Sequence, residues 1–131
     1  MLRAGFRDPE EFRRLTYIAA LMRCFPGRNR SNTGDLPPPP KGIANCAHWL
    51  DAELELLEPK VMILVGQMAI SRFLGPAPLE DRVGKAFGKR PVMIPLPHPS
   101  GQSRWLNAPA NRERLATALA LIAEQRSKFA P

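Results

Sequence analysis

The sequence predicts an α/β fold in which helices cover both faces of a parallel sheet. Two observations support this. Short apolar runs, Val61–Val65 and Val92–Ile94, alternate with longer segments of helical periodicity, which is typical of parallel β-α-β units. The run at 61–65 is also apolar at every position, which favours a strand covered on both faces. The chain has 131 residues, so we expect a single domain over residues 1–131.

The first third of the chain has a short helix, a candidate strand and a loop. Asp8 and Pro9 are typical of a helix start, and this helix is expected to end near Leu15. The apolar run Tyr17–Met22 is interpreted as a buried strand, although such a run could also extend the helix. Residues 28–42 include four consecutive prolines and predict a stiff Pro-rich loop insertion. A surface insertion without a function is the alternative for this loop.

Two helices and a strand are expected in the middle of the chain. Residues 43–57 place apolar side chains at steps of three and four, which predicts an amphipathic helix that Pro59 ends. The strand at 61–65 follows, and Gly66 makes the turn into a helix over 67–74. The stripe that predicts the buried face of the first helix consists of Ile43, Ala47, Leu50, Leu54 and Leu57.

The last third is expected to end in a long helix. Residues 78–90 are left open between a minor strand and a loop, and the strand at 92–94 follows. Pro109 opens the final helix. Its predicted buried face consists of Leu115, Ala118, Leu119, Ile122 and Phe129.

Composition narrows the class of partner. The formal net charge is +7 and the pI is about 10.3, which favours a polyanion such as nucleic acid, with a merely basic surface as the alternative. No apolar run approaches the roughly 20 residues that cross a bilayer, and the start does not resemble a signal peptide. We therefore expect a cytoplasmic protein without membrane contact. In that compartment two cysteines are expected to be thiols or metal ligands rather than a disulfide.

The loop from Pro95 to Asn107 is the strongest candidate for a functional site. It connects a predicted strand to a predicted helix, where ligands bind in open α/β sheets. His98 has a proline on each side, which restricts the backbone around the imidazole. By contrast, His48 lies within a predicted helix and is treated as structural or exposed. Trp105 could stack on a base, but we expect it to anchor the loop against the final helix.

Four blocks of sequence resemble the iron–sulfur-containing bacterial branch (type 4 and type 5-like) of the uracil-DNA glycosylase superfamily. They are residues 17–27, 43–50, 57–66 and 96–101. The resemblance runs from about residue 10 to the end of the chain. It implies a three-layer α/β/α sandwich around a four-stranded, mostly parallel sheet. The family's glycine-rich N-terminal motif has no counterpart before Leu2, so we expect a fold that is truncated at its N-terminus.

The resemblance implies a DNA repair enzyme that flips uracil or a related deaminated base out of DNA and hydrolyses its N-glycosidic bond. His98 would be the catalytic residue, because a donor aimed at the carbonyl where negative charge grows lowers the barrier. Arg104 would contact a phosphate. The partner would be DNA that contains such a base, and we expect a monomer. The implied DNA-binding residues are Pro99, Ser100, Gly101, Gln102, Ser103 and Arg104.

The two cysteines match the last two ligands of the family's four-cysteine cluster. Through this resemblance Cys24 and Cys46 would be a partial ligand set for a [4Fe–4S] cluster, which needs four thiolates. The alternative is that each cysteine is a small buried hydrophobic residue and that this chain binds no cluster.

Three further observations concern the function. The motif that supplies the water-positioning group in the family is absent, so the chain could be a non-catalytic remnant that binds DNA. The region Ala19–Ala20 lacks an asparagine that many relatives carry there, which leaves the preferred base open. A hydrolase with Ser100 as nucleophile and His98 as base is disfavoured, because no Gly-x-Ser-x-Gly elbow is present.

Overall fold

The structure is a computed structural model that describes residues 4–22, 27–32, 36, 39–99 and 104–129. It divides into two compact parts. The sheet unit comprises residues 1–16 and 59–131, and the α2 unit comprises residues 17–58. The elements are α1 (Pro9–Leu15), α2 (Pro40–Leu57), β1 (Val61–Val65), α3 (Gln67–Leu74), α4 (Leu79–Arg82), β2 (Val92–Leu96), η2 (Trp105–Asn107) and α5 (Pro109–Phe129).

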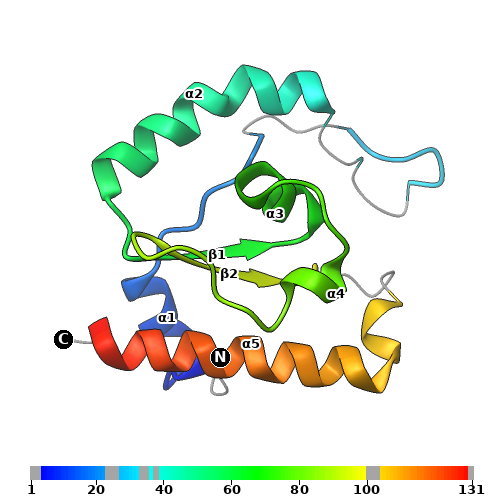
Figure 1. Cartoon of the computed structure of the whole chain (residues 1–131). Helices are drawn as coiled ribbons and strands as arrows, with labels where there is room; N and C mark the ends of the chain where they lie inside the picture. Colours follow the sequence, from blue (N-terminus) through cyan, green and yellow to red (C-terminus); the bar gives the residue numbers. More distant parts are fainter. Residues whose placement is uncertain (1–3, 23–26, 33–35, 37–38, 100–103, 130–131) are drawn as a thin grey trace. The chain divides into compact units, whose positions relative to one another are not determined.

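The sheet unit confirms the predicted α/β fold. β1 and β2 pair in parallel, with Val61 opposite Val92 and Val65 opposite Leu96. β2 is two residues longer than the apolar run at 92–94 suggested. Figure 1 shows α3 and α5 on opposite sides of the two strands. The strands are therefore covered by helices on both faces, as their uninterrupted apolar sequences predicted.

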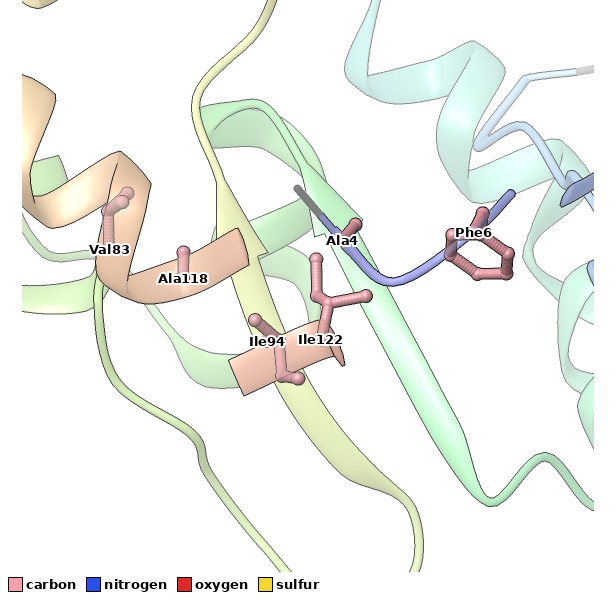
Figure 2. Packing of buried hydrophobic residues seen from close by; sticks show 6 residues of the cluster. All are labelled: Ala4, Phe6, Val83, Ile94, Ala118 and Ile122. Atoms are coloured by element: carbon pink, nitrogen blue, oxygen red, sulfur yellow. The ribbon is translucent and has the colours of Figure 1, made fainter. Parts of the chain in front are cut away.

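The core of the sheet unit lies between the strands and α5. Ile94 of β2 and Ala118 of α5 are both fully buried, and Figure 2 shows them next to Val83 and Ile122. Ala118 and Ile122 confirm the predicted inner face of the last helix. Phe129 does not, because it is 46% exposed. Its ring lies 5.1 Å from the ammonium of Lys60, so it binds a cation at the surface instead of packing in the core.

α1 is held to α5 by a buried carboxylate. As predicted, Asp8 caps the helix, and its side chain accepts a hydrogen bond from the Glu11 N–H at 2.8 Å. The Glu11 carboxylate in turn accepts from the Arg7 N–H at 2.8 Å and from Arg126 Nη2 of α5 at 3.1 Å. The Arg7 backbone N–H is the main cause that lowers the pKa of Glu11, and both arginine side chains lower it further, while burial opposes them.

Residues 78–90, which the sequence left open, form one helical turn and a single bridge. α4 covers Leu79–Arg82. Phe87 then exchanges two backbone hydrogen bonds with Met93 of β2, at 2.9 and 2.7 Å, in antiparallel orientation. The two alternatives were thus both partly right, since the segment is mostly loop with one strand-like residue.

In the α2 unit, the predicted strand at Tyr17–Met22 is wrong. These residues form no strand, and Tyr17 and Ile18 are 58% and 77% exposed. A strand needs a neighbour that satisfies its backbone groups. The only sheet in the described part of the chain pairs β1 with β2, so an apolar run outside it lacks that partner.

The helix of the α2 unit is confirmed and begins earlier than predicted. Pro39 precedes it in extended conformation and Pro40 occupies its first turn, where a missing N–H is not needed. The Pro-rich loop therefore ends before residue 42. Leu50 is buried as expected, but Leu57, at the end of the predicted stripe, is 46% exposed because it lies in the last turn. Among the described residues no helix is long and apolar enough to span a membrane.

Candidate functional site

His98 lies just beyond the carboxyl end of β2, next to the turn that follows β1. The last residue of β2, Leu96, accepts a hydrogen bond from the Gly66 N–H at 2.9 Å, so the two strand ends are tied together. Pro97 is buried, whereas His98 is exposed. A Cβ placed on Gly66 would lie 3.4 Å from His98 Cδ2 and 3.6 Å from His98 Cβ. The His98 side chain therefore lies close to Gly66, within van der Waals reach of a methyl group at that position.

Gly66 is suited to this contact for two reasons. Its φ of +89° and ψ of 160° belong to a region that essentially only glycine occupies. It is also close to His98, since a Cβ at this position would make van der Waals contact with that side chain. Gly75, at the other end of α3, has nearly the same backbone angles, but a Cβ there would meet nothing within 4 Å. The close approach of a histidine thus distinguishes Gly66 from a glycine with the same conformation.

The amino end of α3 adds an electrostatic feature to the His98 site. Gly66 is the N-cap residue of α3, and its carbonyl accepts the Ile70 N–H at 3.1 Å. The first-turn N–H groups of a helix have no acceptor within the helix and carry partial positive charge. An imidazole that donates a hydrogen bond and a helix amino end both favour an oxygen atom that gains negative charge. The site is therefore suited to stabilising an anionic leaving group.

Trp105 holds the far end of the loop that contains His98. Its indole N–H donates to Glu80 Oε1 at 3.0 Å, and its carbonyl accepts from Asn111 Nδ2 at 2.8 Å. Its side chain packs against the core of the sheet unit. Trp105 is thus the anchor that the sequence predicted, because both of its polar groups and its ring have partners within the protein.

Comparison with known proteins assigns the chain to a family. The model of the uracil DNA glycosylase superfamily matches residues 4–121 of the chain. The chain belongs to the uracil DNA glycosylase superfamily. The matched range includes both strands, Gly66, His98 and Trp105, so the resemblance that the sequence blocks predicted is confirmed over nearly the whole chain.

Two relatives indicate the branch of the superfamily. A type-5 uracil-DNA glycosylase of Pyrobaculum aerophilum is 28% identical over 84 residues, which make up 62% of this chain and 34% of that protein. A type-4 uracil-DNA glycosylase of Thermotoga maritima is 34% identical over 58 residues, or 44% of this chain and 27% of that protein. The chain thus spans about a third or less of the length of these relatives. Both support the predicted assignment to the type-4 and type-5 branch.

Only part of the predicted DNA-contact loop falls within the described residues of this superfamily member. Pro99 and Arg104 are both exposed, and Arg104 directly precedes η2. Their positions on either side of the loop leave both available to a ligand. The other four residues of the set, Ser100, Gly101, Gln102 and Ser103, lie outside the described residues.

The cysteines of this chain do not fit a four-iron cluster by themselves. Cys46 is buried on α2, and Cys24 lies outside the described residues, although both belong to the α2 unit. Within the described ranges no three His, Cys, Asp or Glu side chains come together to hold a metal. The sequence has two cysteines in total, whereas such a cluster uses four thiolates. The two cysteines of this chain therefore do not account for a cluster.

Sequence reasoning identified His98 but missed the residues that hold it and its loop. Gly66 was predicted only as a turn, and Glu80 and Asn111 were not singled out. A signal for Gly66 was present, since it directly follows a buried strand and the carboxyl ends of neighbouring parallel strands meet at one edge. Glu80 and Asn111 gave no such signal. Glu80 lies 25 positions from Trp105 in the sequence, and Asn111 is a polar residue near the start of a helix.

Proposed function

We propose that this superfamily member is a DNA repair protein that hydrolyses the N-glycosidic bond of uracil or a related deaminated base in DNA. The observation that carries the proposal is the contact of His98 with Gly66 at the carboxyl edge of a parallel sheet, in a chain that matches the superfamily model over residues 4–121. The names of the two relatives, both uracil-DNA glycosylases, support the choice of substrate. The cytoplasmic location expected from the sequence belongs to the same proposal.

In the proposed reaction, His98 stabilises the departing base. When the bond between the sugar and the base breaks, the bonding electrons move onto the base, and negative charge grows on its carbonyl oxygen. An imidazole N–H directed at that oxygen lowers the barrier, and loss of one such donor typically reduces the rate by about 10²–10³. The amino end of α3 would favour the same charge. Water is the second reactant: its hydroxyl group goes to the sugar, and its remaining proton balances the negative charge on the departing base.

In the same proposal, the loop after His98 contacts the DNA strand. Pro99, Ser100 and Gly101 would press on the strand backbone near the flipped nucleotide. Gln102, Ser103 and Arg104 would extend into or beside the minor groove, with Arg104 on a phosphate. Flipping costs a few kcal/mol, which these contacts and the base pocket must offset. The exposed position of Arg104 at the end of the loop supports its part.

A second candidate function is binding of DNA without excision. The net charge of +7 supports it, because phosphate contacts dominate the affinity of basic proteins for DNA. The two candidates share Arg104 and differ in His98, which only excision or recognition of the damaged base requires.

The test measures release of uracil from single-stranded and double-stranded oligonucleotides that carry one uracil, together with binding to the same strands. The chain has two histidines, which provides a matched control. We expect excision that His98→Ala reduces by about 10²–10³ and that His48→Ala, a change at an exposed position of α2, leaves intact. Arg104→Ala should weaken binding and lower the slope of log affinity against log salt by about one, and Arg13→Ala on α1 is its control.

The outcomes separate the candidates. Binding without excision, equal for uracil and thymine strands and unchanged in His98→Ala, favours the second candidate and removes the first. Absence of salt-dependent binding to either strand contradicts both. Excision that survives His98→Ala supports the activity but shows that His98 does not carry it.

A further inference from the structure

Asn111, in the first turn of α5, has a buried side chain with two polar partners. It is 7% exposed, and within the described residues only Glu11 is a comparable case of a buried polar or charged side chain. The Asn111 Nδ2 atom donates to the Trp105 carbonyl at 2.8 Å, and Asn111 Oδ1 accepts from Arg114 Nη1 at 2.8 Å. A buried amide lowers stability unless its polar atoms are paired. Because both ends of this amide are paired, it links α5 to η2.

Arg114 fixes the orientation of the Asn111 amide. A guanidinium donates hydrogen bonds but cannot accept them, so it selects the oxygen of the amide. The NH2 group of Asn111 is then turned toward η2, where it meets the Trp105 carbonyl. The start of α5 is itself tied down, since the Asn111 and Arg112 N–H groups both donate to the Ala108 carbonyl, at 3.1 and 3.2 Å. The amide therefore reaches Trp105 from a fixed helix turn.

A second element also holds Trp105. Its indole N–H donates to Glu80 of α4 at 3.0 Å. The segment that follows α4 lies against α5, because a Cβ placed on Gly84 would be 3.3 Å from the Arg114 carbonyl oxygen. Gly84 has a φ of +92°, which glycine adopts without steric cost. The two elements that hold Trp105 are thus also in contact with each other.

Arg104 directly precedes this doubly held residue. Its φ of −91° and ψ of 0° are those of a residue in a tight turn, and its carbonyl accepts the Asn107 N–H at 3.0 Å. The backbone of Arg104 therefore belongs to the same short turn that Asn111 and Glu80 hold through Trp105. A displacement of Trp105 would move the Arg104 backbone with it.

We propose that Asn111 is a positioning residue for the contact of Arg104 with DNA. The inference rests on the proposed function, in which Arg104 meets a phosphate. Asn111 itself is buried and acts only through Trp105. A guanidinium whose backbone is held in place before the strand arrives loses less conformational freedom on binding. Residues that lock a contact residue in this way determine how well the contact is made. Loss of the Asn111 amide should therefore weaken the phosphate contact without removing the charge that makes it.

The test is a double-mutant cycle on binding of the full chain to an oligonucleotide that carries one uracil, measured by fluorescence anisotropy over a range of salt concentrations. Asn111→Leu removes the amide, keeps a side chain of similar size and leaves the net charge unchanged. It is measured alone and together with Arg104→Ala. Asn111→Ser, a smaller polar side chain that fits the same space, takes its place if Asn111→Leu fails to fold. Ile122→Val is the matched control, because Ile122 is also buried on α5, about three turns further along the helix.

We expect Asn111→Leu to weaken binding by about three- to tenfold and to lower the slope of log affinity against log salt, because part of the phosphate contact is lost. In the Arg104→Ala background the same change should alter the affinity by less than about twofold. Ile122→Val should bind as the wild type does.

Equal losses from Asn111→Leu with and without Arg104 would mean that Asn111 supports the fold alone. That result overturns this inference and leaves the phosphate contact of the proposed function in place. If Arg104→Ala itself does not weaken binding, or the wild type shows no salt-dependent binding, both the phosphate contact and this inference are overturned.

Discussion

Val61–Val65 and Tyr17–Met22 are apolar runs of similar length, yet only the first is a strand. Val61–Val65 pairs with β2 in register and has helices on both faces of the sheet. Tyr17–Met22 belongs to the other compact part of the chain, where Ile18 is 77% exposed. The difference shows that an apolar run alone does not predict a strand, because a strand also requires a neighbouring backbone with which to pair. His98 lies just beyond the end of β2, which is one of the two strands that pair with each other.

The largest expected effect is a difference in the free energy of unfolding between variants in the two regions. Ile94→Ala removes a fully buried side chain from β2 and should lower the free energy of unfolding by about 2–5 kcal/mol. Ile18→Ala, which removes the same atoms from an exposed position, should change it by no more than about 0.5 kcal/mol. Urea denaturation of the two variants measures both. Equal losses would mean that Tyr17–Met22 is packed in the native protein.

The next effect concerns the support of His98. Gly66→Ala and Gly75→Ala place a methyl group at nearly identical backbone angles, so each should destabilise the protein by about 1–3 kcal/mol through strain. Only Gly66→Ala also brings the added methyl group into van der Waals contact with His98, at 3.4 Å from Cδ2. We expect both variants to lose stability in a thermal melt, while only Gly66→Ala shifts the His98 ring signals in NMR spectra. Unchanged His98 signals in Gly66→Ala would show that the His98 side chain does not lie against Gly66.

A pH-dependent effect is expected where α1 meets α5. The pKa of Glu11 is lowered from an ordinary value of 4.5 by the Arg7 N–H and by the two arginine side chains. The unfolded chain therefore binds its proton at higher pH, so this stabilisation is complete above about pH 4.5 and is lost as the pH falls through the folded-state pKa. Glu11→Gln should be less stable than wild type at pH 7, and the gap should narrow in acid. Glu10→Gln, an exposed neighbour, should show no such gap.

The smallest effect tests the anchor of the loop. Trp105→Phe keeps a ring against the core but removes the hydrogen bond to Glu80, which should lower the free energy of unfolding by about 0.5–1.5 kcal/mol. Glu80→Gln keeps an acceptor and should lower it by less. Both changes are measured by denaturant titration. A loss in Trp105→Phe no larger than that in Glu80→Gln would show that this hydrogen bond contributes little.

Local signals predicted much of the fold, and non-local contacts account for the rest. Asp8 with Pro9, the apolar run of β1 and the apolar periodicity of α2 lie within a few residues of the structures they specify. Each predicted the right element, although Leu57 at the end of the α2 stripe is exposed. Whether Tyr17–Met22 becomes a strand depends on a partner elsewhere in the chain, which the run itself does not encode.

The same division applies to the candidate site. His98 and Trp105 were predicted from their place between a strand and a helix. The contact of His98 with Gly66 joins residues 32 positions apart and arises only when β1 and β2 pair. The bond from Trp105 to Glu80 spans 25 positions. Such contacts depend on how distant segments pack in the folded chain, not on spacing in the sequence.

In the proposed function, the imidazole of His98 recognises a deaminated base. The chain has two histidines, so NMR titration of the ring signals with a single-stranded oligonucleotide that carries one uracil tests it directly, with a thymine oligonucleotide as the control. We predict that the uracil strand shifts the His98 signals, that the thymine strand does so much less, and that neither moves those of His48. Signals of His98 that respond equally to both strands, or to neither, would contradict the account.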